Sequence, residues 1–380
     1  MSESAPRIVT PDHDARTSAL QTGSWWRRPR LPRRRPRLGI VGPMFGRRPG
    51  SITTQGVILT DHFRSAGYEV TSVSESPNRY LRLADVLATL ARRRREIDVL
   101  IVETYSGPSF VVQDAATMLA RAFGWPIVLH LHGGGLPAFT ARFPRWSRRV
   151  FGRAHAAVAP SAFLADLASR HGVPARVIPN IVDLPSYPFR HRPSVRPRLL
   201  WMRTFHPLYN PGMALRVLAR LRGEHADATL VMAGRDDGLE AEVRRDAAAI
   251  GLGEAVRFPR FLDHAGKCRE GEAADVFVNT NRVDNTPVAV LEACAMGLPV
   301  VSTDVGGMPA MLQDGETGLL VGTDDDDAMA DAILRLVRTP ALAARLSAAG
   351  PRVARQAAWE SVLPAYEALF DELLAGGGSV

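Results

Sequence analysis

The sequence has almost no lysine, few cysteines and no long apolar run. Lys267 is the only lysine among 380 residues, although lysine and arginine together number 47. A function that needs a side-chain ammonium must therefore use Lys267 or rely on arginine, whose planar fork binds differently. The two cysteines, Cys268 and Cys294, lack the spacing of metal ligands. We therefore expect two reduced thiols and no zinc site.

Several protein classes are excluded by missing signals. No stretch approaches the roughly 18 to 20 apolar residues that cross a bilayer, and no apolar segment of the signal-peptide type follows the N-terminal arginines. We therefore expect a cytoplasmic protein. There is no Walker loop, and GIVGPMFG (39–46) departs from the GxGxxG fingerprint in spacing, with a proline after its second glycine. These absences argue against P-loop NTPases and nicotinamide-dependent oxidoreductases.

The positive charge is concentrated near the N-terminus. The formal charge is +8, and residues 25–38 hold seven arginines and no acid, so 8 − 7 = +1 remains for the rest. Two tryptophans, Trp25 and Trp26, stand beside these arginines and resemble an interfacial anchor. Each arginine near an anionic leaflet contributes on the order of 1 kcal/mol. We expect residues 1–36 to form a disordered basic arm at an anionic membrane surface. A leader without a partner and a nucleic-acid arm remain alternatives, the latter weakened because no nucleic-acid-binding module follows.

Apolar strands alternate with helical stretches along the rest of the chain. This alternation predicts parallel sheets, each wound with helices on both faces. The proline-rich stretch 181–197 breaks the alternation and is typical of a linker between domains. The expected strands are 37–42, 68–73, 97–103, 125–132, 155–161 and 175–180 before the linker, and 198–203, 228–234, 255–261, 275–279, 299–303 and 317–321 after it.

The fold class is therefore α/β, with two doubly wound Rossmann-like domains facing an interdomain cleft. Interdomain clefts are preferred ligand sites. We place the N-terminal domain at 37–190 and the C-terminal domain at 191–355. A final helix near 357–374, within a segment 356–380, is expected to cross back onto the N-terminal domain.

The most informative stretch is 276–309, which indicates a strand, a polar loop, a helix, a second strand and a glycine turn. Ligands of open α/β sheets bind where strands end and helices begin, and helix starts suit phosphate. Asp284 in the loop and Glu292 on the helix are candidate carboxylates for sugar hydroxyls and a ribose. The alternative is a turn cap for Asp284 and a solvated helix position for Glu292. Further candidates at these ends are the capping residues Asn285 or Thr286, Pro287 at the first helical position, and Gly306 and Gly307.

Three more candidates lie at other strand ends. His132 in HLHGGG (130–135) precedes glycines that admit a close ligand, although a single strand-end histidine is often structural. Arg203 closes the first strand after the linker, where its fork suits a diphosphate. Its alternative role is an interdomain salt bridge. Asn210 and Pro211 precede the next helix.

Taken together, these residues resemble the retaining GT-B glycosyltransferases of family 4 (glycosyl transferases group 1). The resemblance spans roughly 37–375 and is strongest in DNTPVAVLEACAMGLPVVSTDVGG (284–307), where the family has two glutamates separated by seven residues, a small-residue helix, a strand and a GG turn. VIPNIVDL (177–184) is similar to the family's interdomain segment, and HLHGG to its catalytic-side histidine loop. The stretch 49–70, with Gly50 and Ser51, resembles the loop and helix that lie near the donor phosphates.

The resemblance implies transfer of a sugar from a nucleotide-diphosphate donor to an acceptor hydroxyl with retention of configuration. The donor would bind the C-terminal domain, and a glycan or lipid-linked acceptor the N-terminal domain, in cell-surface glycan or glycolipid synthesis on the inner face of the membrane. It also implies no metal or other cofactor. Asp284 would lie near the transferred sugar, Glu292 near the donor ribose, Arg203 at the diphosphate and His132 near the sugar O6.

Three departures from the family pattern concern donor binding. Asp284 is one methylene shorter than the usual glutamate, Met202 replaces a glycine, and the phosphate-binding lysine is replaced at or near Asn210. Lys267, Arg47 or Arg48 are possible substitutes for that cation. Two rival functions remain: a nucleotide-sugar epimerase of the same fold, and a catalytically silent GT-B partner protein.

Overall fold

The computed structural model describes residues 34–46 and 53–376. Residues 36–380 cluster as one unit, separate from residues 1–35, and the description below concerns that unit alone. Gly50, Ser51, Arg47 and Arg48 lie outside the described residues, as does almost all of the basic arm.

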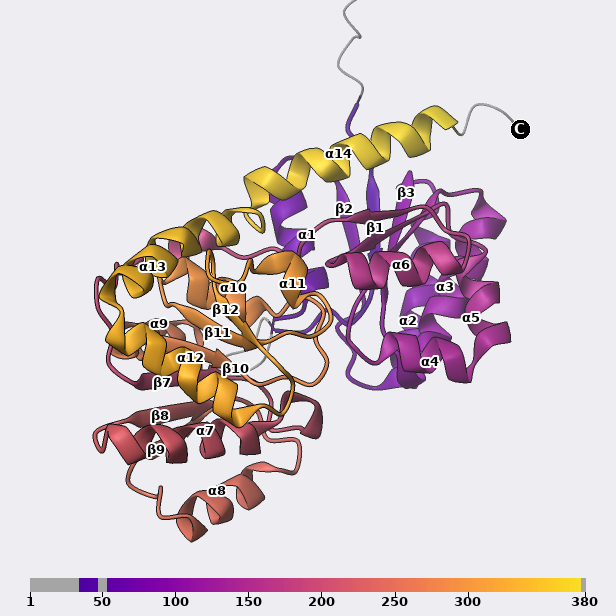
Figure 1. Cartoon of the computed structure of the whole chain (residues 1–380). Coiled ribbons are helices and arrows are strands. Elements are labelled where there is room, and N and C mark those ends of the chain that lie inside the picture. The colour runs from indigo at the N-terminus through magenta and orange to yellow at the C-terminus, as the bar shows by residue number, and fades with distance from the viewer. Residues whose placement is uncertain (1–33, 47–52, 377–380) are drawn as a thin grey trace, which may run out of the picture. The chain divides into compact units, whose positions relative to one another are not determined.

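The first sheet is parallel and has the strand order β2-β1-β3-β4-β5-β6 (Figure 1). Its strands are β1 (Leu38–Val41), β2 (Val70–Val73), β3 (Val99–Thr104), β4 (Ile127–Leu131), β5 (Ala156–Ala159) and β6 (Ala175–Val177). The connecting helices are α1 (Gln55–Ser65), α2 (Arg79–Arg92), α3 (Phe110–Phe123), α4 (Leu136–Arg142), α5 (Pro144–Phe151) and α6 (Ala162–Arg170), with a short 3-10 turn η1 (Gly107–Ser109).

The second sheet is also parallel, with the order β12-β11-β10-β7-β8-β9. Its strands are β7 (Arg198–Met202), β8 (Thr229–Ala233), β9 (Val256–Arg260), β10 (Val276–Asn279), β11 (Val300–Thr303) and β12 (Leu319–Val321). Its helices are α7 (Pro211–Glu224), α8 (Glu240–Ala249), α9 (His264–Ala273), α10 (Val288–Ala295), α11 (Met308–Met311), α12 (Asp326–Arg338) and α13 (Pro340–Arg355), with 3-10 turns η2 (Leu184–Ser186) and η3 (Pro207–Tyr209). The twelve strands expected from the sequence are all confirmed.

Alternating side chains give each sheet two apolar faces. In β3, Leu100 and Val102 pack with α2, α3 and α5, whereas Val99 and Ile101 pack on the opposite face with α1. The last helix, α14 (Trp359–Gly376, yellow in Figure 1), joins this second face through Tyr366 and Phe370. A strand buried on both faces is apolar along its whole length, so a charged residue at its end is unusual and requires a partner.

A buried arginine ties the linker to the second sheet's helices. The side chain of Arg192 is fully buried and donates only to carbonyl oxygens, those of Arg190, Gly271, Ala274 and Met296, at 2.5 to 3.2 Å. Three of these carbonyls lie at the C-terminal ends of α9 and α10, where the helix dipole favours a cation. Burial, followed by the nearby Arg190, lowers the pKa of Arg192 to about 10, so the group stays charged at neutral pH.

Replacing Arg192 with methionine should lower the free energy of unfolding by about 3 kcal/mol, because buried carbonyls lose their donors. Urea unfolding of the full chain measures this loss. The matched control is Arg220→Met, since Arg220 is half-exposed and pairs with the exposed Asp327, and should change stability by less than about 0.5 kcal/mol. Equal effects of the two substitutions would contradict the role given to Arg192.

Candidate active site

The candidate residues of the second sheet gather at the carboxyl ends of its strands. Arg203 follows β7, the loop 280–287 follows β10, and Gly306 and Gly307 follow β11. Strands β7, β10 and β11 are neighbours in the sheet, so parallel pairing places these three ends side by side. This is the edge at which open α/β sheets bind ligands.

Arg203 and Asp284 bind each other directly. Their side chains form an ion pair between Nη2 and Oδ2 and are both largely buried, at 14% and 11% exposure. Asn281 donates to the same carboxylate, and the backbone N–H of Asn285 donates to Oδ1 at 2.8 Å. The guanidinium also stacks on Tyr209, 4.2 Å from the ring centroid. The alternative considered for Arg203 was a salt bridge between domains, whereas the observed pair lies within the second domain and its partner is the candidate acid itself.

Buried polar atoms without partners lie on Arg203 itself and on the segment 279–285 that carries Asp284. Among the described residues, Nε of Arg203 and the side-chain oxygens of Asn279, Asn281 and Asn285 lack a hydrogen-bond partner. Buried polar groups are nearly always paired, so each exception calls for an explanation. One donor and three amide oxygens around a charged pair are the groups that a polyhydroxylated, anionic ligand satisfies.

The two glycines after β11 support the acidic loop from behind. A Cβ at Gly306 would lie 1.8 Å from the carbonyl oxygen of Asp284, and one at Gly307 would lie 1.7 Å from that of Asn285. Gly306 has φ +57, and the N–H of Gly307 donates to the Asp284 carbonyl at 3.1 Å. The sequence suggested that this turn lets backbone approach a ligand; the structure explains both glycines by the approach of the acidic loop.

Glu292 is not a solvated helix residue, which corrects the alternative left open by the sequence. It is 4% exposed on α10, and its Oε1 accepts from Tyr187 and contacts Nζ of Lys267, both at 2.7 Å. Burial and the Glu292 carboxylate raise the pKa of Tyr187 far above its ordinary value, so the phenol stays a neutral donor. The one lysine of the chain therefore neutralises the second candidate carboxylate.

Asn210 lies at the start of α7 in a left-handed conformation, with φ 48. Its amide donates to Oδ1 of Asp324 at 2.7 Å, and Arg282 binds the same aspartate. No side-chain cap from Asn210 to the helix is formed. Asn210 is thus held by the loop that follows β12. That loop and Arg203 both lie at the carboxyl ends of strands of the second sheet.

The helix start after the acidic loop differs from the prediction. Pro287 is the N-cap of α10 and not its first helical residue, and no side chain caps this helix. Thr286 instead donates from Oγ1 to the carbonyl of Pro160, at the end of β5, at 2.7 Å. A Cβ at Gly134, two residues after His132, would lie 3.2 Å from Val283. These contacts bring the strand ends of the first sheet to the acidic loop of the second.

His132 is buried and belongs to a cluster that the sequence did not identify. Its Nε2 lies 2.6 Å from Oε2 of Glu103, and Nδ1 of His130 lies 2.9 Å from Oε1 of the same carboxylate. The ring of His132 stacks on Tyr105, with centroids 4.8 Å apart. In the sequence, Glu103 is marked only by its place as an acid at the end of an apolar strand. A charge at such a buried position is expected to be paired.

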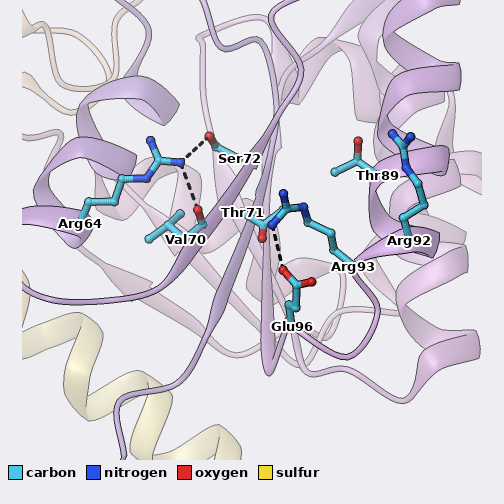
Figure 2. Close-up of a pocket in the computed structure, with 8 residues that line it drawn as sticks. All are labelled: Arg64, Val70, Thr71, Ser72, Thr89, Arg92, Arg93 and Glu96. Atoms are coloured by element: carbon cyan, nitrogen blue, oxygen red, sulfur yellow. Dashed lines mark hydrogen bonds and ion pairs between the residues drawn. The ribbon is translucent and has the colours of Figure 1, made fainter.

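A hollow at the edge of the first sheet is separate from these residues. Figure 2 shows its lining, in which Arg64 donates to the carbonyl of Val70 and Arg93 pairs with Glu96. It lies along the edge strand β2 and the C-terminal end of α2, and none of the candidate site residues lines it. We therefore assign it no part in the site.

Comparisons with known proteins agree with this geometry. Residues 28–185 match the family model described as Glycosyltransferase Family 4, and residues 196–339 match Glycosyl transferases group 1. The chain belongs to glycosyltransferase family 4. This glycosyltransferase is 27% identical over 386 residues to the phosphatidyl-myo-inositol mannosyltransferase of Mycobacterium leprae, across 90% of the chain and 99% of the relative.

Solved structures show that the fold of this glycosyltransferase is GT-B. Sucrose-phosphate synthase from Thermosynechococcus elongatus aligns with a TM-score of 0.73 at 18% identity, covering 90% of this chain and 100% of that one. HepE from Anabaena, in complex with UDP-glucose, aligns with a TM-score of 0.70 at 15% identity, covering 89% and 100%. Within the described part of the chain, no helix has both the length and the apolar content needed to span a bilayer.

Gly307→Ala should displace the acidic loop of this glycosyltransferase, because its new methyl group would overlap the carbonyl oxygen of Asn285. Overpacking of this kind costs about 1 to 3 kcal/mol, and a thermal melt should show it. Gly223→Ala is the matched control: it lies in α7, where an added Cβ meets nothing within 4 Å, and it should be neutral or stabilise by up to about 1 kcal/mol. A Gly307 variant as stable as the wild type would refute the account of the turn.

Proposed function

We propose that this glycosyltransferase moves a sugar from a nucleotide-diphosphate sugar to an acceptor hydroxyl with retention of anomeric configuration. The observation that carries the proposal is the Arg203–Asp284 pair with its surrounding unpartnered polar atoms. Its cation suits the diphosphate, its carboxylate and asparagine oxygens suit sugar hydroxyls, and Glu292 lies on the next helix.

In this proposal Arg203 stabilises the charge that develops on the leaving diphosphate. Its Nε has no partner among the described residues, and its Nη2 is shared with Asp284, so donors remain for phosphate oxygens. A preorganised donor aimed at developing charge is commonly the largest single contribution to such catalysis. Asp284 then holds Arg203 in place and accepts from the transferred sugar, while His132 lies near the sugar O6 and the reacting centre.

Glu292 binds the donor ribose in the same scheme. Tyr187 and Lys267 both address its Oε1, which leaves Oε2 for hydroxyl donors. Asn285, Thr286, Pro287, Gly306 and Gly307 shape the loop, and Asn210 lies at the start of α7. Asn210 bears no charge, so the diphosphate relies on Arg203 and on backbone N–H groups.

The chemistry proposed is front-face substitution. The bond between the anomeric carbon and the diphosphate oxygen breaks, and the acceptor oxygen bonds to the same face of the sugar. The acceptor's proton passes to the leaving diphosphate, so no protein nucleophile and no metal ion is required. The named relative acts on phosphatidyl-myo-inositol, and a lipid-linked acceptor at the inner membrane face would suit the arginine-rich arm.

Donor specificity and stereochemistry are tested together. In a thermal-shift panel of nucleoside diphosphates and their sugars, one nucleoside series should raise the melting temperature. With that donor and an acceptor, NMR of the product should show the donor's anomeric configuration, and EDTA should leave turnover unchanged. An epimerised sugar formed without acceptor would favour the epimerase, and binding without transfer or hydrolysis would favour the silent partner.

Arg203→Ala should lower turnover about 100- to 1,000-fold, the loss typical of a deleted oxyanion donor. The effect should fall mainly on kcat, because the charge that Arg203 meets grows in the transition state. Arg203→Lys keeps the charge but loses the planar guanidinium, so its turnover should lie between those of the wild type and Arg203→Ala. The exposed Arg220→Ala serves as control. Unchanged turnover in Arg203→Ala would remove Arg203 from the mechanism.

The arginine-rich arm is tested by deletion. Removal of residues 1–36 should weaken binding to vesicles containing anionic phospholipid, because it takes away six of the seven arginines within 25–38 and each contributes on the order of 1 kcal/mol near such a surface. Vesicles of neutral lipid are the control and should bind both chains equally weakly. Undiminished binding to anionic vesicles would exclude the arm as the membrane contact.

A further inference from the structure

The first sheet of the glycosyltransferase holds a buried acid that the proposed reaction does not yet use. Glu103 lies at the carboxyl end of β3 and is 1% exposed. It pairs in register with His130 of the adjacent strand β4, and both of its oxygens contact imidazole nitrogens, at 2.9 Å for His130 and 2.6 Å for His132. A carboxylate this deeply buried is costly unless it is paired.

The backbone around Glu103 leaves its side chain little freedom. A Cβ at Gly42, on β1's end, would lie 2.5 Å from the Cβ of Glu103, and one at Gly56, on α1, would lie 3.3 Å from its Cδ. Two glycines on different elements therefore make room for this one side chain. The carboxylate is held between them and the two histidines, at the strand end that faces the candidate site.

The protonation pattern follows from burial and pairing. Burial alone would raise the pKa of Glu103, but the imidazoles of His132 and His130 overcome it and hold the pKa well below its usual range. Burial lowers the pKa of His130. Glu103 is therefore ionised, and His130 is neutral with its proton on Nδ1 directed at Glu103.

We propose that Glu103 is a positioning residue that fixes the ring and the tautomer of His132, and this rests on the function proposed above. With the Nε2 proton of His132 assigned to its 2.6 Å contact with Oε2 of Glu103, Nδ1 is the nitrogen left to meet a ligand. Which nitrogen of a histidine carries the proton is set by the partner of the other. Stacking on Tyr105 limits rotation of the ring.

A metal ion is the competing explanation for this cluster. Glu103, His130 and His132 offer ligand atoms within 4.8 Å of one another, a spacing that an ion could use. Ligands on one tetrahedral zinc, each about 2.0 to 2.2 Å from the ion, would lie roughly 3.3 Å apart. The observed separations of 2.6 and 2.9 Å are shorter than that spacing. The His130 contact is a hydrogen bond. The His132 contact is too bent to be one, but neither Nε2 of His132 nor Oε2 of Glu103 has a hydrogen-bond partner elsewhere among the described residues, so we assign the Nε2 proton to this contact.

The test is a double-mutant cycle on the full chain. Glu103→Gln keeps the side-chain volume but removes the charge, and kcat should fall about 10- to 100-fold, as for other partners that orient a histidine, with the donor KM changed less than about twofold. If Glu103 acts through His132, the double variant Glu103→Gln, His132→Ala should be no slower than His132→Ala alone. Multiplying losses would overturn the proposal. The control is Glu367→Gln on α14, which removes a carboxylate that accepts a hydrogen bond from Tyr68. This variant should retain wild-type kcat.

Histidine ¹⁵N NMR tests the proposal independently of catalysis. The wild-type spectrum should show the His132 proton on Nε2, and Glu103→Gln should change that signature; a proton on Nδ1 in the wild type would overturn it. If His132→Ala has wild-type turnover, the catalytic role proposed for His132 fails while this spectrum still decides the role of Glu103. Stoichiometric metal in the purified protein, lost in Glu103→Gln, would replace the shared protons with an ion and overturn the proposal.

Discussion

The architecture of the site depends on one constraint: a carboxylate buried at a strand end must be paired. Glu103, Asp284 and Glu292 are all buried or nearly so, and each is paired with a different type of base. Two imidazoles meet Glu103, a guanidinium meets Asp284, and the ammonium of Lys267 meets Glu292. Losing one partner would leave an uncompensated buried charge, which costs far more than a surface ion pair contributes. These pairs consequently fix the positions of the side chains in the proposed chemistry.

The choice of base at each acid follows from the chemistry expected there. Arginine keeps several donors, so Arg203 can hold Asp284 and still address phosphate oxygens. Lysine is a compact point charge and engages one oxygen of Glu292, leaving the other for a hydroxyl donor. Histidine can donate from one nitrogen and accept at the other, so in our proposal His132 contacts Glu103 through one nitrogen and keeps the other for a ligand. The chain's single lysine thus lies at Glu292, where an arginine guanidinium would occupy both carboxylate oxygens.

How much the sequence could predict depends on how local each signal was. The strands were evident because burial on both faces makes each an apolar run, and Asp284 and Arg203 stood at strand ends where ligands bind. Pairing between distant residues was not evident: nothing in the sequence joins Lys267 to Glu292 or Glu103 to His132, since these contacts arise from sheet order. The helix start was misplaced at Pro287 because Thr286, a good capping residue, does not cap the helix. Its hydroxyl donates to the carbonyl of Pro160 instead.

The aspartate in place of the family's usual glutamate is consistent with the Arg203–Asp284 pair. A side chain one methylene shorter reaches less far into a ligand site. Gly306 and Gly307 let the backbone of the acidic loop pack closely against them, because any Cβ there would overlap the carbonyls of Asp284 and Asn285. The backbone N–H of Asn285 and the amide of Asn281 then hold the carboxylate against the guanidinium. A longer acid at position 284 would have to fold back to keep those contacts. Because the family combines the same two glycines with the longer acid, the contacts from Asn281 and Asn285 are what fit the shorter acid to Arg203.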